Sequence, residues 1–189
     1  MTERPPSGPL SERPQPGPLS ERPRPAPRVL VAAVMQSRSI MIEALGKVAV
    51  EEVVNAGLSL VRSVVVNGER QYIQQLVSNV SNANEADAIL MVGGVGIGPR
   101  DGTCEAIDAF VDRRIEGFGE AYRRMLSEEI GVHAFLARAT AGVYNQCLVF
   151  AMTGREPDVR RAMRDLIVPT LPKAIELATG RRRGGEVRG

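Results

Sequence analysis

The sequence predicts an α/β domain in which helices cover both faces of a mostly parallel sheet. Short apolar segments rich in β-branched residues alternate with segments whose apolar residues recur at helical spacing. This alternation is typical of βαβ units. A glycine-rich loop, "GGVGIGPRDG" over residues 93–102, follows the third apolar segment, and open α/β folds bind their ligands at such positions.

Composition divides the 189 residues into one domain between two tails. Residues 1–27 contain the tandem repeat "GPLSERPQP" and "GPLSERPRP", and their proline content predicts a disordered tail. This tail is either a plain linker or a docking peptide for a protein partner. Residues 28–179 carry the alternating pattern and are predicted to fold as one domain. Residues 180–189, which include "GRRRGG", are predicted to be a basic disordered tail.

Each element of the first half is predicted from its own apolar pattern. The run "RVLVAAV" suits a buried parallel strand, and "LSLVRSVVV" and "DAILMVGG" have the same character. The segments between these runs place apolar residues on one helical face, and Gly57 is a plausible C-cap for the first of them. The predicted order is strand 28–34, helix 39–56, strand 58–66, helix 69–81 and strand 87–94.

The second half continues the pattern with longer helical segments. The stretch "ATAGVYNQCLVF" suits two strands that are joined at "YNQ". Pro169 and Pro172 are expected to break the last helix into two pieces. The predicted elements are helix 103–112, helix 118–130, a strand pair that ends in strand 147–152, and a helix over 156–178.

Composition also argues against several kinds of partner. The formal net charge of +2 and three scattered tyrosines argue against nucleic acid. No apolar run is long enough to span a membrane and no signal-peptide pattern is present, so no membrane partner and a cytoplasmic location are expected. Cys104 and Cys147 fit no metal or disulfide spacing and are predicted to be small buried residues. The single histidine, His133, is predicted to pack at the surface or at an interface.

The loop over residues 93–102 is predicted to hold an anion, most often a phosphate. Glycines let a ligand approach the backbone, and the N–H groups at the start of the following helix favour negative charge. The loop is neither a P-loop, because no Gly-Lys-Ser/Thr closes it, nor a dinucleotide fingerprint, because Pro99 takes the place of the last glycine. A tight structural turn is the alternative explanation of the glycines.

Asp101 makes the loop chemically more specific. A carboxylate beside a phosphate is unfavourable unless it binds a cation or handles a proton, so Asp101 is a candidate metal ligand and catalytic residue. The alternative is a structural pair with Arg100. Likewise, Thr103 and Glu105 have a structural alternative as a helix N-cap with an acid in the first turn.

Three motifs occur in order over residues 87–154. The segment "GGVGIGPRDGTCEAI" is similar to a "GGTG…RD.T.EA" signature, "IEGFGEAYRRMLSEEIG" to a "PGFGE" segment, and "ARATAGVYNQCLVFAMTG" to an "SRAVAG……FAMPG" segment. These are signatures of the MoaB/Mog family of molybdenum cofactor biosynthesis proteins. The chain resembles this family over roughly residues 28–178, and its MoaB branch most closely.

The resemblance implies a three-layer α/β/α sandwich, assembly into a trimer or hexamer, and a site for molybdopterin. Active members of the family use Mg-ATP to transfer AMP to the terminal phosphate of molybdopterin, a reaction that depends on positioning and charge neutralisation. Asp101 is implied to position the metal or the reacting phosphates. The residues implied to bind the substrate are Gly93, Gly94, Gly96, Thr103, Glu105, Arg138 and Gly154.

The site pattern departs from that of the family and looks degenerate. Val95 stands where the family has threonine, Ala137 replaces a serine, and Thr153 replaces a proline. The aspartate-rich loop after the first strand becomes "MQSRSIMIEAL", which contains no aspartate. After the second strand, Gly68 occupies the place of a further aspartate, and Glu69 beside it is the candidate replacement and second catalytic carboxylate.

Three functions remain open from the sequence. The first is a molybdopterin adenylyltransferase-like enzyme that uses Asp101 and Glu69 with Mg-ATP. The second is a non-catalytic relative that binds pterin or nucleotide. The third is an oligomeric interaction or regulatory protein that reuses the fold and docks through its proline-rich tail.

Overall fold

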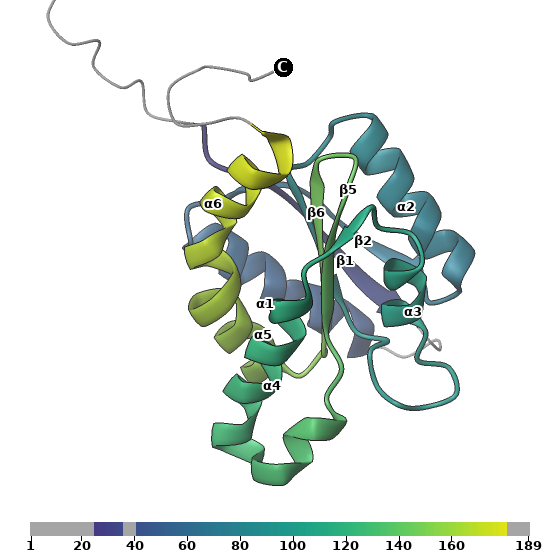
Figure 1. Cartoon of the computed structure of the whole chain (residues 1–189), viewed down its shortest axis with the longest axis vertical. Helices are drawn as coiled ribbons and strands as arrows, with labels where there is room; N and C mark the ends of the chain where they lie inside the picture. The colour runs from purple at the N-terminus through teal and green to yellow at the C-terminus, as the bar shows by residue number, and fades with distance from the viewer. Residues whose placement is uncertain (1–24, 36–40, 181–189) are drawn as a thin grey trace, which may run out of the picture.

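The computed structural model describes residues 25–35 and 41–180, which form a three-layer α/β/α sandwich (Figure 1). The strands of its central sheet are β1 (Arg28–Met35), β2 (Ser59–Asn67), β3 (Ala88–Val92), β4 (Arg113–Arg114), β5 (Thr140–Tyr144) and β6 (Cys147–Met152). Their order is β2-β1-β3-β6-β5-β4. The first four strands in this order are parallel, β5 is antiparallel to β6, and β4 is antiparallel to β5. The predicted mostly parallel sheet is confirmed.

The outer layers consist of α1 (Met41–Asn55), α2 (Arg70–Asn82), α3 (Thr103–Asp108), α4 (Glu116–Ile130), α5 (Glu156–Ala162) and α6 (Val168–Thr179). A 3₁₀ turn, η1 (Gly131–Leu136), follows α4, and a π turn, η2 (Met163–Ile167), joins α5 to α6. Helices α2 and α3 pack on one face of the sheet, and α1, α4, α5 and α6 pack on the other (Figure 1). The start of β1 and the end of α6 lie at the same edge of the sheet.

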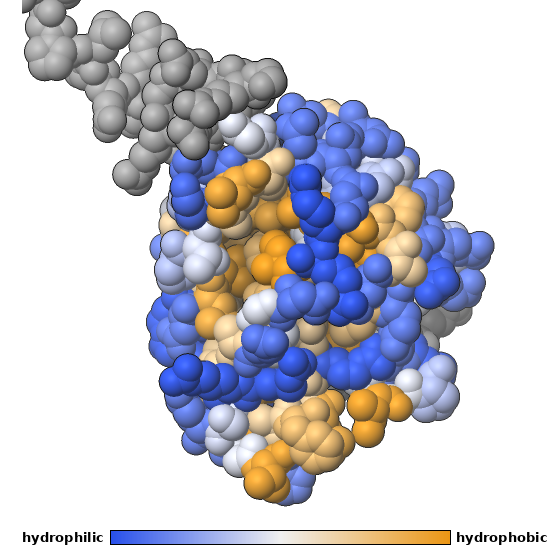
Figure 2. Space-filling model, viewed as in Figure 1, coloured by the Kyte–Doolittle hydropathy of each residue, from blue (hydrophilic) through white to orange (hydrophobic). Residues whose placement is uncertain are grey.

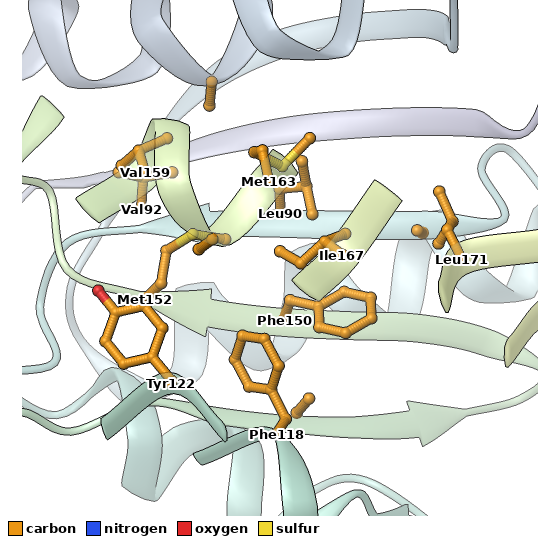
Figure 3. Packing of buried hydrophobic residues seen from close by; sticks show 14 of the residues in the cluster. Leu90, Val92, Phe118, Tyr122, Phe150, Met152, Val159, Met163, Ile167 and Leu171 are labelled. Carbon is orange, nitrogen blue, oxygen red and sulfur yellow. The ribbon is translucent and has the colours of Figure 1, made fainter. Parts of the chain in front are cut away.

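The central strands divide their side chains between two apolar cores. For example, β1 points Val31 into the core under α1, α4, α5 and α6, and Leu30 into the core under α2 and α3. Every residue of β3 and β6 is buried, which explains why these strands read as continuous apolar runs. Figure 3 shows the first core, where the rings of Phe118 and Phe150 meet edge to face with centroids 5.2 Å apart.

Most predicted elements match the structure within two residues, but α3 is shorter than predicted. It ends at Asp108 because the chain turns at Ala109. The N–H of Asp112 then donates to the carbonyl of Val143 at 2.8 Å, next to the pairing of β4 with β5. The prediction of a helix through residue 112 is therefore wrong. Strand β4 was missed because both of its residues are exposed arginines, which give no apolar pattern.

The last helix is interrupted by a π turn and not, as predicted from the sequence, by Pro169 and Pro172 together. After α5, the chain widens into η2, and α6 then runs through Pro172 without a break. Pro169 lies in the first turn of α6, where a missing N–H costs least. The prediction that both prolines divide the helix is wrong for Pro172, and the interruption that exists is the π turn before Pro169.

The hairpin and the cysteines agree with prediction. Between β5 and β6, Asn145 and Gln146 have φ angles of 44° and 67°, as a two-residue hairpin turn requires. Cys104 and Cys147 are buried and are not joined in a disulfide. His133 is exposed in η1, in agreement with a surface position.

Several sequence predictions concern residues outside this description. Apart from residues 25–27 and Gly180, the predicted tails lie outside the described residues, and so does the segment 36–40 within "MQSRSIMIEAL". In the described ranges, no helix combines the length and the apolar character needed to cross a membrane.

Candidate functional site

The glycine loop leaves β3 at the carboxyl edge of the parallel strands. Gly93 and Gly94 have φ angles of 103° and 68°, a conformation that other residues rarely adopt. The N–H of Gly93 donates to the carbonyl of Met152 at 2.9 Å, which ties the loop to the end of β6. A Cβ on Gly93 would lie 3.2 Å from the carbonyl oxygen of Val34, so the glycine also permits close packing against β1.

Thr103 closes the loop from inside the protein. Its side chain is fully buried, and its hydroxyl donates to the Gly93 carbonyl at 3.1 Å. Its N–H donates to the Gly94 carbonyl at 3.0 Å. The hydroxyl and the N–H of Thr103 therefore hold the two ends of the loop together, and the hydroxyl does so from the buried side of the loop.

Asp101 folds back onto the loop that carries it. One carboxylate oxygen, Oδ2, accepts the N–H of Gly98 at 2.9 Å, and the N–H of Asp101 donates to the Gly98 carbonyl at 3.0 Å. A Cβ on Gly96 would lie only 2.4 Å from the same Oδ2 atom, so Gly96 makes room for this carboxylate. Carboxylate oxygens are the ligands that Mg²⁺ takes from proteins, so Asp101 stays a candidate cation ligand by its chemistry.

The loop presents a row of backbone donors. Within the described residues, the N–H groups of residues 94–97 donate to no protein acceptor. Gly96 and Ile97 are exposed, whereas the Val95 side chain is only 2% exposed and packs in the core under α2 and α3. A run of backbone N–H groups with no acceptor among the described residues is an arrangement that can bind anionic oxygens.

Glu69 lies on the loop next to that of Asp101. The carbonyl oxygen of Gly68 is 4.0 Å from the position of a Cβ on Gly102, and the N–H of Gly68 donates to the carbonyl of Met35 at 2.8 Å. The end of β1 and the loops that follow β2 and β3 are therefore neighbours. Glu69 is the N-cap residue of α2, and its exposed carboxylate accepts a hydrogen bond from Gln71 at 3.3 Å.

Glu105 and Arg138 form an ion pair with 2.6 Å between Oε2 and Nη2. The Arg138 guanidinium holds the pKa of the Glu105 carboxyl below its usual value, and the Glu105 carboxylate raises the pKa of Arg138. The pair joins α3 to the segment that enters β5. Because β5 is antiparallel to β6, this segment lies at the carboxyl edge of the parallel strands.

Gly154 follows β6 at the same edge, beside a hydrogen-bonded network that the sequence did not reveal. The hydroxyl of Tyr122 lies 2.8 Å from the hydroxyl of Thr153, which donates to the buried carboxylate of Asp158 at 2.7 Å. Arg155 pairs with the same carboxylate at 2.8 Å. Of this network, sequence reasoning had singled out Thr153 but had not connected it with Tyr122, Arg155 or Asp158.

The predicted site residues thus lie along one edge of the sheet in three groups. The first is the glycine loop with Asp101, the second is the pair of Glu105 and Arg138, and the third is Gly154. Glu69 adjoins the first group through Gly68 and Gly102. In the part of the chain that is described, no three His, Cys, Asp or Glu side chains gather to form a metal site.

An open pocket of about 200 Å³ adjoins the second group. Sequence reasoning missed most of it because its residues are far apart along the chain. Its lining residues are Cys104, Glu105, Asp108, Arg114, Arg123, Arg138, Ala139 and Thr140.

Comparison with known proteins identifies the family. Residues 37–173 match the family described as "Probable molybdopterin binding domain". The chain is 36% identical over 146 residues to molybdenum cofactor biosynthesis protein B of Bacillus cereus, covering 76% of this chain and 86% of that protein. It is 34% identical over 149 residues to the protein of the same name from Bacillus subtilis, covering 78% and 88% of the two chains.

Solved structures give the same relationship. A crystal structure of molybdenum cofactor biosynthesis protein B is 31% identical, has a TM-score of 0.78, and covers 85% of this chain and 100% of its own. The molybdopterin biosynthesis enzyme MoaB of Thermus thermophilus is 26% identical with a TM-score of 0.69, covering 82% and 98%. The chain therefore belongs to the MoaB/Mog family of molybdopterin-binding-domain proteins.

Proposed function

We propose that this protein acts in molybdenum cofactor biosynthesis and binds molybdopterin at the carboxyl edge of its parallel strands. The observation that carries the proposal is the glycine loop, whose N–H groups over residues 94–97 have no acceptor within the described residues. These donors suit the terminal phosphate of molybdopterin. The family description and the names of the relatives support the same ligand.

We further propose that the protein adenylylates molybdopterin with Mg-ATP. In this reaction a phosphate oxygen of molybdopterin forms a bond to the α-phosphorus of ATP, the bond between the α- and β-phosphates breaks, and pyrophosphate leaves. Mg²⁺ neutralises phosphate charge and takes one or two carboxylates, with phosphate oxygens and waters as its remaining ligands. Asp101 and Glu69, on neighbouring loops, fit this requirement, and the loop N–H groups orient the acceptor phosphate.

A non-catalytic pterin-binding or interaction protein is the second candidate. It is favoured by Val95, which occupies the family's threonine position and is buried in the core under α2 and α3, so that it offers no hydroxyl to a ligand. Ala137 likewise offers no hydroxyl where the family has serine. If the remaining donors hold the ligand without supporting turnover, the protein acts as a carrier or sensor.

Calorimetric titration of the full chain with molybdopterin, with and without Mg-ATP, tests these proposals, and mass spectrometry detects the adenylylated product. We expect binding and product formation. Binding without product would leave the non-catalytic function, whereas absence of binding would overturn both ligand-based functions.

The role of Asp101 is tested by Asp101→Asn, which keeps the shape of the side chain. We expect product formation to fall by roughly a hundredfold, because the variant lacks the charge that would hold the cation. The control is Glu51→Gln, which removes a surface carboxylate on α1 that pairs with Arg160. Equal rates for Asp101→Asn and the wild type would show that this carboxylate has no catalytic role.

We also propose a homo-oligomer, either a trimer or a hexamer, located in the cytoplasm. Apolar side chains of η1 support the assembly, since Val132, Phe135 and Leu136 are 81%, 76% and 43% exposed. Figure 2 shows apolar surface at this end of the molecule, beyond α4. Exposed groups of this kind are typical of subunit contacts.

A further inference from the structure

We propose that the pocket between α3, α4 and β5, which adjoins the candidate molybdopterin site at Glu105 and Arg138, binds a phosphate group through Arg123 together with Arg114 and Arg138. The pocket shares α3 with the glycine loop, but none of its lining residues belongs to that loop. Its lining includes Glu105 and Arg138, which the family resemblance implies for molybdopterin, whereas Arg114 and Arg123 have no role in the function proposed above.

The three arginines reach the pocket from three elements. Arg114 comes from β4, Arg123 from α4, and Arg138 from the segment before β5. In Figure 2, strongly hydrophilic surface crosses the centre of this face, over the segment that joins α3 to α4. Guanidinium groups that converge from separate elements can contact several oxygens of one phosphate.

A glycine in α4 brings Arg123 to the wall of the pocket. A Cβ on Gly119 would lie 2.8 Å from the carbonyl oxygen of Ala139 and 3.3 Å from Nη1 of Arg123. The absence of a side chain at this position lets α4 approach the segment before β5, and it leaves room for the guanidinium. Arg123 is consequently partly buried, whereas the neighbouring Arg124 is exposed.

The charges of the pocket are not balanced. Arg138 pairs with Glu105 at 2.6 Å, and Arg114 pairs with Asp108 at 3.2 Å and with Glu116, which is not a lining residue, at 3.4 Å. Arg123, by contrast, forms no ion pair and no hydrogen bond with any residue that the structure describes. Among the lining residues, three guanidinium groups thus face two carboxylates, and Arg123 is the guanidinium that has no ion-pair partner in the described part of the chain.

The remaining lining groups do not cancel this charge. The hydroxyl of Thr140 donates to Asp108 at 2.5 Å, which further satisfies that carboxylate. Burial raises the pKa of the Cys104 thiol, so that sulfur stays neutral at physiological pH. A pocket of about 200 Å³ has room for a phosphate group and a few waters. The open side allows the phosphate to be part of a larger molecule, such as a nucleotide.

The test is calorimetric titration of the full chain at low ionic strength with three separate probes, namely inorganic phosphate, pyrophosphate and ATP without Mg²⁺. We expect at least one probe to bind and Arg123→Gln to weaken its binding by about tenfold or more, because a charged hydrogen bond is lost. The matched control is Arg124→Gln, which removes the neighbouring, exposed arginine and should leave affinity unchanged.

The outcomes separate the possible sources of the phosphate group. Binding of inorganic phosphate that depends on Arg123 supports a site for the isolated anion, whereas Arg123-dependent binding of ATP alone supports a site for a nucleotide phosphate. Binding of none of the probes, or equal affinity of Arg123→Gln and Arg124→Gln for the probe that binds, overturns the proposal. Molybdopterin titration of Arg123→Gln keeps this result distinct from the function proposed above, which requires the glycine loop and not Arg123.

Discussion

Individual residues of the glycine loop are held by contacts that tolerate almost no added volume. The Asp101 carboxylate accepts the Gly98 N–H and lies against Gly96, where even a methyl group would collide with it. Only a residue without a side chain fits beside an inward-turned carboxylate. The φ angle of Gly96 is not in the left-handed region, so the backbone itself does not require glycine here. The glycine is needed because its missing side chain leaves space for the Asp101 carboxylate.

We predict that Gly96→Ala weakens molybdopterin binding and lowers overall stability only slightly. The new Cβ displaces the Asp101 carboxylate and breaks its exposed hydrogen bond with the Gly98 N–H, which lowers the free energy of unfolding in urea by about 1 kcal/mol or less. Because the displaced carboxylate no longer organises the loop, binding should weaken by roughly fivefold, which corresponds to about 1 kcal/mol.

The matched control is Gly117→Ala in the first turn of α4, where a Cβ would meet nothing within 4 Å. It should bind molybdopterin like the wild type and gain up to about 1 kcal/mol of stability. Wild-type affinity in Gly96→Ala would mean that Asp101 does not organise the ligand site.

At the scale of elements, the Tyr122 network fixes the start of α5 against α4. Tyr122 is fully buried and hydrogen-bonds to Thr153, which in turn donates to Asp158 at the first turn of α5. The turn after β6, which contains Thr153 and Gly154, is thereby held by side-chain hydrogen bonds.

This network predicts a pH dependence. Burial raises the pKa of Tyr122 to about 12. Because the folded pKa lies above the unfolded value near 10, the contribution of Tyr122 to stability is complete below about pH 10 and is lost as the pH rises towards 12. Ultraviolet titration should show one tyrosinate step near pH 12 that is missing in Tyr122→Phe. At neutral pH this variant should lose about 1 kcal/mol in urea unfolding. An unchanged titration curve in Tyr122→Phe would contradict this assignment.

The ion pair of Glu105 and Arg138 predicts the opposite pH dependence, because its contribution to stability is lost as the pH falls. Arg138 lowers the pKa of Glu105, so the stabilisation is present above the usual pKa of 4.5 and disappears as the pH falls through the lowered value. Since both side chains are partly exposed, Glu105→Gln should cost less than about 1 kcal/mol at pH 7. Urea unfolding at pH 7 and at pH 3 measures this difference, which should vanish at the lower pH. A difference that persists at pH 3 would show that the ion pair is not its source.

At the scale of the whole molecule, the exposed apolar side chains of η1 bear on assembly. We predict that Phe135→Asp lowers the mass measured by light scattering to that of the monomer, because a charge would be buried in the contact. Val54→Asp on α1 is the control, since Val54 is also exposed, at 58%, but lies on a different element. An oligomer that survives Phe135→Asp would exclude η1 as the essential contact.

Much of the fold could be predicted because the buried strands have a clear apolar pattern in the sequence. The strands β1, β3 and β6 are covered on both faces, so they appear as apolar runs of the expected length. In contrast, β4 is a strand only because Arg113 and Arg114 pair with β5, and no local pattern reveals such a partner.

The candidate site was predictable to the extent that it is one continuous loop. In residues 93–103, the glycines, Asp101 and Thr103 together indicate a tight loop that leads into a helix. The arginine pocket is different, because Arg114, Arg123 and Arg138 become neighbours only when β4, α4 and the segment before β5 pack together. In a chain so rich in arginine, the sequence does not distinguish these three from those that are merely exposed.

The shared edge at which β1 begins and α6 ends has a practical consequence. This edge is opposite to the one that carries the glycine loop (Figure 1). A protein attached to a sensor chip through either end of its domain, at Arg28 or at Thr179, therefore presents its ligand-facing edge to the flowing solution. Attachment at either end of the domain accordingly leaves the glycine loop accessible, so surface-based binding measurements can complement the calorimetric titrations.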